Sequence, residues 1–123
     1  MRIITVLLLI FCCWLNAHSQ NTTNSGTEFW TAYMDHNTGA SNNRGLDSAS
    51  IMSLYITSTV NTSGTVSIAD NSFAPIPFTV STNQVTIVTI PPAAFLSTSG
   101  MANKGVHIIA LKPVAIYAHI YAS

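Results

Sequence analysis

The last part of the chain, residues 104–121, constrains the fold more than any other stretch, because strand-forming residues dominate it. Lys112-Pro113 interrupts this stretch, and proline removes a backbone hydrogen-bond donor and disfavours a helical residue before it. The sequence therefore predicts two β-strands with a break between them. Because successive side chains of a strand point to opposite faces, the first strand presents Val106, Ile108 and Ala110 on one face and His107, Ile109 and Leu111 on the other.

The second strand divides between two faces in the same way. One face carries Val114, Ile116, Ala118 and Ile120, and the other carries Ala115, Tyr117, His119 and Tyr121. A strand that is apolar on both faces is usually covered on both. We therefore expect these two strands to form the centre of a packed sheet.

Short strand-like segments recur along the rest of the chain. With the two above, the candidates are residues 27–34, 51–59, 65–69, 76–80, 84–90, 106–111 and 114–121. Turn-forming residues separate them at 61–64, 70–72 and 81–83. Pro75 and Pro77 indicate that 76–80 is an edge strand or begins with a bulge. Apart from a short helical turn at 93–96, no segment shows helical periodicity. This pattern predicts an all-β fold, an antiparallel sandwich or barrel. Of the two, we expect an antiparallel β-sandwich of about seven short strands.

Residues 1–19 have the pattern of a secretory signal peptide. Arg2 supplies the positive charge, Ile3–Leu15 is apolar, and Ala17-His18-Ser19 ends in a small residue before Gln20. We expect cleavage between Ser19 and Gln20, which leaves residues 20–123 as one secreted or cell-surface domain with no membrane span. The alternative is an uncleaved anchor, but the apolar run is shorter than the ~20 residues of a membrane-spanning helix.

Cysteine content and charge narrow the class of protein further. Cys12 and Cys13 both lie in the leader, and Phe11 before them is too large for a lipidation site, so the mature chain has no cysteine. A domain of this kind depends on burial and hydrogen bonding alone, which is typical of bacterial exported proteins. Residues 20–123 contain three Lys or Arg and four Asp or Glu, a net charge of −1. Without a basic surface, nucleic acid is not expected as a partner.

The candidate catalytic residues do not form a recognisable active site. His107 and His119 lie inside predicted strands, where a histidine is usually a packed residue. Asp35-His36 is the one acid–histidine pair, but neighbours on a strand point in opposite directions. No serine lies in a Gly-x-Ser-x-Gly motif. We therefore expect no enzyme activity, no catalytic residue and no cofactor.

A calcium site and N-glycosylation are the remaining local possibilities. Asp35-x-Asn37-x-Gly39 resembles the start of a calcium loop, but its glycine comes one position early and no glutamate closes it; Asp47 is the nearest acid. Most Asx-rich runs of this kind are turns whose side chains cap their own backbone, so we interpret these residues as a turn within the polar loop 35–50 and expect no metal site. Two sequons, at Asn21 and Asn61, match the glycosylation pattern.

A wider pattern runs along the chain in a fixed order. It comprises Gly26-Thr27-Glu28-Phe29-Trp30, Leu54–Ser58, Ser63–Val66, Phe78–Val80, Val85–Pro91, Lys104–Ile108 and Pro113–Tyr117. In order and spacing the chain resembles the N-terminal domain of the IgG Fc-binding protein family, as found in large exported bacterial proteins. The resemblance covers residues 26–122.

The resemblance implies a non-enzymatic, β-rich recognition module within a longer adhesin-like protein. It identifies no Fc contact residue, so the partner-binding residues remain unknown. Family members continue well past the position of Tyr121, so we expect the chain to be a fragment, truncated at its C-terminal end.

Two functions follow as expectations. The first is a binding or adhesion module that contacts a protein or glycan, such as a glycoprotein, with the rest of its own longer chain as a neighbour. The alternative is a structural module of a surface stalk or layer with no external ligand. A fold argument alone does not separate them.

The sequence also predicts self-association. Val114–Tyr121 has no lysine or proline to protect an open strand edge after Pro113, and Val85–Ile90 is an uncharged run of high β-propensity. We expect residues 20–123 alone to dimerise or aggregate.

Overall fold

The computed structural model describes residues 24–34, 50–97 and 100–122, and these residues form an all-β structure. The eight strands of the described residues are β1 Ser25–Thr31, β2 Tyr33–Met34, β3 Ser50–Thr57, β4 Thr62–Ile68, β5 Ile76–Val80, β6 Val85–Ile90, β7 Phe95–Leu96 and β8 Val106–Ala122. A 3-10 turn, Pro92–Ala94, precedes β7. No α-helix occurs among the described residues, so the prediction of an all-β protein is confirmed.

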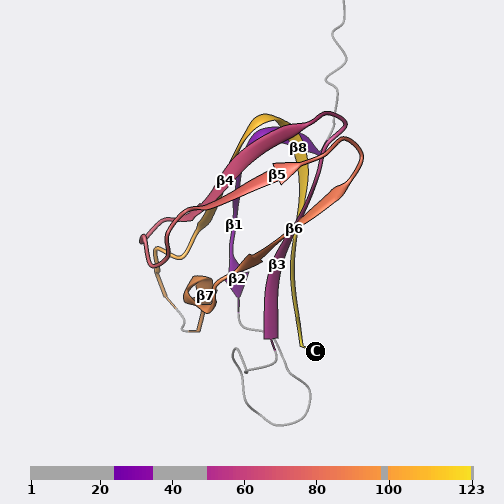
Figure 1. Cartoon of the computed structure of the whole chain (residues 1–123). Helices are drawn as coiled ribbons and strands as arrows, with labels where there is room; N and C mark the ends of the chain where they lie inside the picture. The colour runs from indigo at the N-terminus through magenta and orange to yellow at the C-terminus, as the bar shows by residue number, and fades with distance from the viewer. Residues whose placement is uncertain (1–23, 35–49, 98–99, 123) are drawn as a thin grey trace, which may run out of the picture.

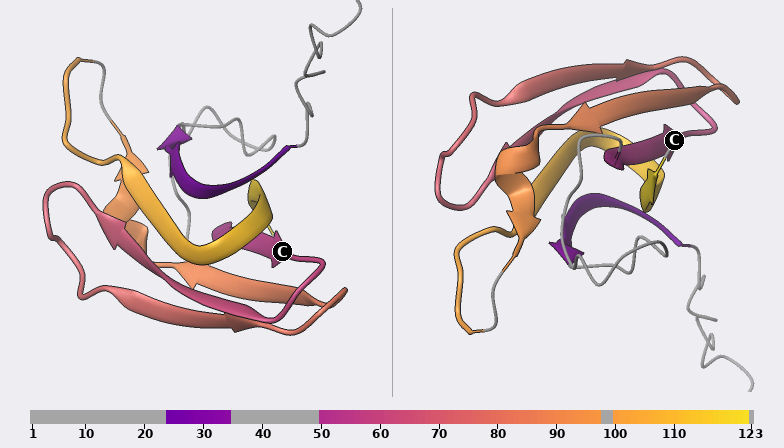
Figure 2. Two further views of the ribbon diagram at one scale, coloured as in Figure 1. Left: turned by 90° about the horizontal axis from the view of Figure 1, so that it is seen from above. Right: turned by 90° about the horizontal axis from the view of Figure 1, so that it is seen from below.

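The central element is β8, a strand of 17 residues that pairs antiparallel with β1, β3 and β4. It begins at the left of Figure 1, bends at the top and descends beside β3. Seen from above, in the left view of Figure 2, β8 lies between β1 and the β4–β5 pair. The sequence-based expectation that this stretch forms the centre of the sheet is therefore confirmed.

The prediction of a break at Lys112-Pro113 is wrong, because β8 continues through it. The reason lies in the pairing. The ladder to β4 ends at Ala110 and the ladder to β3 begins at Ala115. On the other edge, β1 pairs with Ile109 and then with Val114. Pro113 lies in the gap of both ladders, where its missing N–H removes no ladder hydrogen bond.

β3 to β6 form one long bent hairpin rather than four independent strands. Thr57 pairs with Val85 at the end of the β3–β6 ladder, and Thr62 pairs with Val80 at the start of the β4–β5 ladder. Between these pairs lie residues 58–61 on one side and 81–84 on the other, so the register is the same in both arms. The turn expected at 61–64 is therefore wrong: the chain bends at 59–60, and residues 62–64 are the start of β4.

The bend gives one nearly closed, barrel-like antiparallel sheet instead of the expected sandwich. The strand order is β5-β4-β8-β3-β6, with β1 also on β8. At the two ends of this order, the Thr86 hydroxyl of β6 donates to the Thr79 carbonyl of β5, at 2.7 Å. A sandwich needs two separate sheets, and β8 prevents this because it pairs with strands of both arms.

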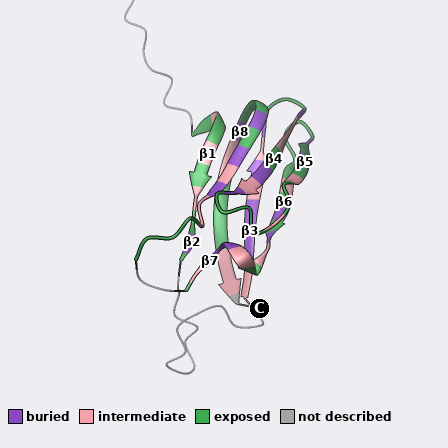
Figure 3. Ribbon diagram, turned by 90° about the vertical axis from the view of Figure 1, so that its left-hand side faces the viewer, coloured by how far each residue is buried: buried purple, intermediate pink, exposed green. Residues whose placement is uncertain are grey.

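The inner faces of the two arms enclose one core. Its fully buried side chains include Leu54, Ile56, Val66, Val80, Val106, Ile108 and Val114. Burial alternates along the strands, as Figure 3 shows in purple and green. Gly64 lies under the ring of Phe78, and a methyl group at Gly64 would overlap that ring and the carbonyl oxygen of Ile109.

A small parallel pair, β2 with β7, covers one end of the core. Tyr33 of β2 is buried, and its hydroxyl donates to the Ser53 carbonyl at 2.8 Å. Burial raises the pKa of Tyr33 well above its usual range, so this hydroxyl stays protonated and continues to donate. Ala94 and Phe95 complete the cover.

Side-chain hydroxyls and an amide hold the corner of the bent sheet. The Ser58 hydroxyl donates to the Pro113 carbonyl at 2.8 Å and accepts from the Val60 N–H at 3.3 Å. The Thr62 hydroxyl accepts from the Lys112 N–H at 3.0 Å. The Asn61 side-chain oxygen accepts from the N–H and the hydroxyl of Thr82, at 2.8 and 2.9 Å. These bonds replace ladder bonds that the bend removes.

The two faces of β8 can be compared at adjacent isoleucines. Ile108 is fully buried and Ile109 is half exposed. We expect Ile108→Ala to lower the free energy of unfolding by ~2–5 kcal/mol, the range for a buried isoleucine, and Ile109→Ala by ~1 kcal/mol or less. Chemical denaturation of both variants measures this. Equal losses would contradict the assignment of inner and outer faces.

The corner predicts a second difference between neighbours. Ser58→Ala leaves the Pro113 carbonyl without its side-chain donor, so we expect a loss of ~1–3 kcal/mol in unfolding free energy. Thr59, the exposed residue next to it, provides the control, and Thr59→Ala should change stability by less than ~0.5 kcal/mol. If Ser58→Ala were equally harmless, the corner would not depend on this hydroxyl.

Candidate functional site

The outer face of the sheet is unusually apolar and aromatic for a surface that no described element covers. Large exposed side chains on it are Trp30, Val85, Ile87, Ile109, Leu111 and Tyr117. The sequence-based expectation that both faces of β8 are covered is therefore wrong. The described residues contain no helix or second main sheet to lie over this face. Contiguous exposed apolar surface of this kind commonly marks an interaction site.

One part of this face, which we call the tyrosine patch, lies on the arm formed by β3, β6 and the second half of β8. It consists of Tyr55, Val85, Ile87, Tyr117, His119 and Tyr121. The cross-strand pairs Tyr55–Tyr117 and Tyr55–Ile87 fix its arrangement. The ring of His119 lies 5.4 Å from that of Tyr121 and 6.4 Å from that of Tyr55, between centroids. Tyr117 is 62% exposed and is the most accessible of the three tyrosines of the patch.

The other arm carries a smaller aromatic site at β1 and the first half of β8. Trp30 and His107 are cross-strand partners and their rings stack at 4.1 Å with an angle of 8°. The His107 Nε2 lies 2.8 Å from the Glu28 carboxylate oxygen. Because Glu28 and His107 engage each other, and no described nucleophile contacts the imidazole, this arrangement can position a surface but does not assemble a nucleophile–base pair.

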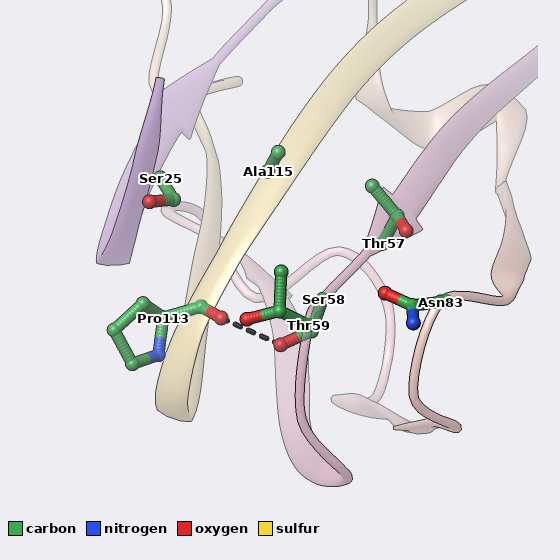
Figure 4. Close-up of a pocket in the computed structure, with 7 residues that line it drawn as sticks. All are labelled: Ser25, Thr57, Ser58, Thr59, Asn83, Pro113 and Ala115. Carbon is green, nitrogen blue, oxygen red and sulfur yellow. Dashed lines mark hydrogen bonds between the residues drawn. The ribbon is translucent and has the colours of Figure 1, made fainter. Parts of the chain in front are cut away.

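A small pocket lies at the corner, beside the tyrosine patch. It measures about 160 Å³ and is lined by Ser25, Thr57, Ser58, Thr59, Asn83, Pro113 and Ala115. Figure 4 shows the Ser58 hydroxyl pointing to the Pro113 carbonyl across it. The Thr57–Ala115 pair in its wall is two residues along the strands from the Tyr55–Tyr117 pair. The pocket therefore continues the patch.

The lining of this pocket contains hydroxyl and amide groups but no acid, base or cation. It is smaller than pockets that enclose drug-sized ligands, about 300–1,000 Å³. It can therefore receive one small neutral polar group by hydrogen bonding, and it has no group for proton transfer.

The candidate residues proposed from the sequence fall into two groups. The cleavage residues Ser19 and Gln20, the sequon at Asn21, Asp35-His36 and the calcium-like residues Asn37, Gly39 and Asp47 all lie outside the described residues. His107 and His119 lie on the outer face, and they contact aromatic rings.

The sequon asparagine Asn61 is exposed at the corner, and its side-chain oxygen is occupied by Thr82. Glycosylation there stays a prediction. Sequence reasoning missed the tyrosine patch as a site, although the alternation of Tyr117, His119 and Tyr121 along one strand face was the signal for it.

Metal ligation and membrane crossing were considered for the described part of the chain. No group of three or more His, Cys, Asp or Glu side chains there could hold a metal ion. Within the same residues, no helix has the length and apolarity needed to cross a membrane.

Comparisons with protein-family models, with curated proteins and with solved structures found no match.

The ion pair between Lys104 and Asp70 lowers the pKa of the Asp70 carboxyl group. Lys104 Nζ lies 2.7 Å from the Asp70 carboxylate, and the Ser72 N–H donates to the same side chain at 3.0 Å. The hydrogen bond from Lys104, and then those from Ser72, lower the pKa of Asp70 to about 2. This pair joins the β4–β5 turn to the segment before β8.

A folded-state pKa below the unfolded value stabilises the protein above the unfolded pKa, and this stabilisation is lost as the pH falls through the folded pKa. For Asp70 the loss runs from about pH 4 to about pH 2. We expect Asp70→Asn to be less stable than the parent protein at neutral pH and to lose less stability across that window, as measured by denaturation at several pH values. Lys104→Met should behave similarly. If the free energy of unfolding changed with pH in the same way in the parent and in both variants, the ion pair would not contribute to stability.

Proposed function

We propose that this chain is an exported, non-enzymatic recognition module that binds a neutral glycan, or the glycan-bearing surface of a protein, through the tyrosine patch. The observation that carries the proposal is the row of exposed aromatic rings on β3 and β8 beside a hydroxyl-lined pocket. Export, non-enzymatic character and a place at the cell surface come from the leader and from the resemblance to the IgG Fc-binding family.

The chemistry of the patch favours a sugar. One face of a pyranose ring presents C–H groups that pack on an aromatic ring, while its hydroxyls need hydrogen-bond partners. Tyrosine supplies both an apolar ring and a polar tip. The pocket adds Thr57, Thr59 and Asn83, whose hydroxyl and amide groups suit a neutral ligand. Because neither surface contains a lysine or an arginine, an anionic ligand gains no pairing with such a side chain there.

A second candidate is a structural module of a surface layer or stalk. The observation that favours it is the edge of β8 along residues 116–121, which pairs with no described strand. An open strand edge is a site for pairing with another chain. The two functions differ in one respect that can be measured: only the first requires an external ligand.

The test uses the purified mature chain and an array of neutral oligosaccharides, with a glycoprotein and its deglycosylated form as further probes. We expect retention of at least one neutral glycan. Tyr117→Ala should weaken that binding by about tenfold or more, as for a central aromatic residue of a binding surface. Met101→Ala is the matched control, because Met101 is a fully exposed apolar side chain outside the sheet. Trp30, the single tryptophan of residues 20–123, reports fluorescence changes.

Three outcomes have distinct meanings. Binding that Tyr117→Ala weakens and Met101→Ala preserves supports the proposal. Binding that survives Tyr117→Ala would place the site elsewhere. Retention of the deglycosylated protein alone would make the ligand a protein, and retention of nothing would favour the structural module.

A further inference from the structure

The second half of β8 has a partner on only one of its edges. Along one edge, β3 pairs with every residue from Ala115 to Ala122. On the other edge, β1 reaches Val114 and Ala115 and no further. Asn24, immediately before β1, is an exposed bend and is not part of the ladder with β8. Among the described residues, no strand pairs with Ile116–Tyr121 on this side.

This edge has none of the features that usually prevent strand pairing. Natural edge strands are protected by charged side chains, proline or a bulge, and residues 114–122 contain no charged residue and no proline. Its pairing with β3 runs without a register shift, so no bulge turns the edge away. The edge is therefore competent to accept another strand.

The core-facing side chains next to this edge are incompletely covered. Ile116 and Ile120 are only partly buried although they point to the inner face, and Ala118 between them is exposed. In contrast, Ile108 and Val114, where β1 is present, are fully buried. A strand added beyond β8 would cover the same inner face at its unprotected end.

We propose that the occupant of this edge is a second copy of β8, paired antiparallel about a two-fold axis at Ala118. The five residues from 116 to 120, Ile-Tyr-Ala-His-Ile, are palindromic in side-chain type around Ala118, and they lie just beyond the residues that pair with β1. A two-fold axis there places Ile116 opposite Ile120 of the partner subunit, and Tyr117 opposite His119 of the partner subunit. Aliphatic and aromatic cross-strand pairs of this kind are favourable, and no like charges meet. A two-fold contact also closes on itself, so this edge of β8 is not left open to a third chain.

The dimer would join the two tyrosine patches into one continuous outer surface, because their strands become neighbours in a single sheet. If the patch binds a glycan as proposed above, a dimer would present two sites on one rigid face and gain avidity for repeated ligands. The pairing of β8 itself does not depend on that function. Its test therefore measures association rather than ligand binding.

The test uses the mature chain, which has no cysteine of its own. In an antiparallel pair, directly opposite residues have Cβ atoms about 4.5–5.5 Å apart, close to the range that a disulfide spans. Ala118→Cys places one thiol of each subunit at the axis and should form a disulfide-linked dimer under mild oxidation. Met101→Cys, also exposed but outside the sheet, should cross-link at least about tenfold more slowly.

A complementary variant should separate the subunits. Ala118→Lys sets two like charges opposite each other, and because Ala118 is exposed in the monomer the fold should be unaffected. We expect light scattering to show a dimer of the parent chain at micromolar concentration and a monomer of Ala118→Lys with an unchanged circular dichroism spectrum.

Several results would overturn the proposal. A parent chain that stays monomeric, a dimer that resists Ala118→Lys, or equal cross-linking of the two cysteine variants would each exclude this axis. Large aggregates instead of a dimer would indicate open-ended pairing, for example through Val85–Ile90. A monomer that dimerises only after removal of residues 20–23 would assign the edge to the chain's own N-terminal segment.

Discussion

The pairing of β8 with strands of both arms is the constraint on which the rest of the structure depends. Because one strand of 17 residues joins β1, β3 and β4, the two arms cannot separate into independent sheets. They bend toward each other instead, and their inner faces enclose a single core. The same bend turns the opposite face of β8 outward, so Tyr117 and Leu111 are exposed by the pairing that buries Ile108 and Val114.

Such a bend removes backbone hydrogen bonds, and polar side chains replace them at little cost in buried volume. Ser58 and Thr62 each bond a backbone group of β8 next to or at Pro113, while Asn61 bonds Thr82 across the hairpin. Buried polar groups are expensive without partners, and Ser58 and Thr62 are buried with theirs. The corner is therefore rich in hydroxyl groups and lies next to the tyrosine patch. Ser58, which holds the corner, also lines the pocket that we propose for ligand binding.

The sequence predicted the elements better than their assembly. Alternation and β-branched runs located β3, β5 and β6 closely, and they located β8 apart from the break expected at Lys112-Pro113. Pro75 and Pro77 indicated that β5 is an edge strand or begins with a bulge, and β5 pairs with β4 alone. The prediction of a sandwich was wrong because the strand pattern does not show that the β3–β6 and β4–β5 ladders keep one register across the bend. Polar residues 58–64 resemble a turn in the sequence, whereas their side chains bond β8 and the chain continues. The exposed outer face was missed for a related reason, since an apolar face does not reveal whether a layer covers it.

The central feature of the fold is that β8 pairs with three strands of the same molecule. Nuclear magnetic resonance of the monomeric Ala118→Lys chain can test this pairing directly. Cross-strand proton contacts should join Ile108 to both Phe29 and Val66, and residues near Ala118 to Leu54, in the same molecule. The result predicted is one continuous set of contacts from β1 through β8 to β3 and β4. Contacts that place β3 and β4 in two separate sheets, with β8 in only one of them, would contradict the account.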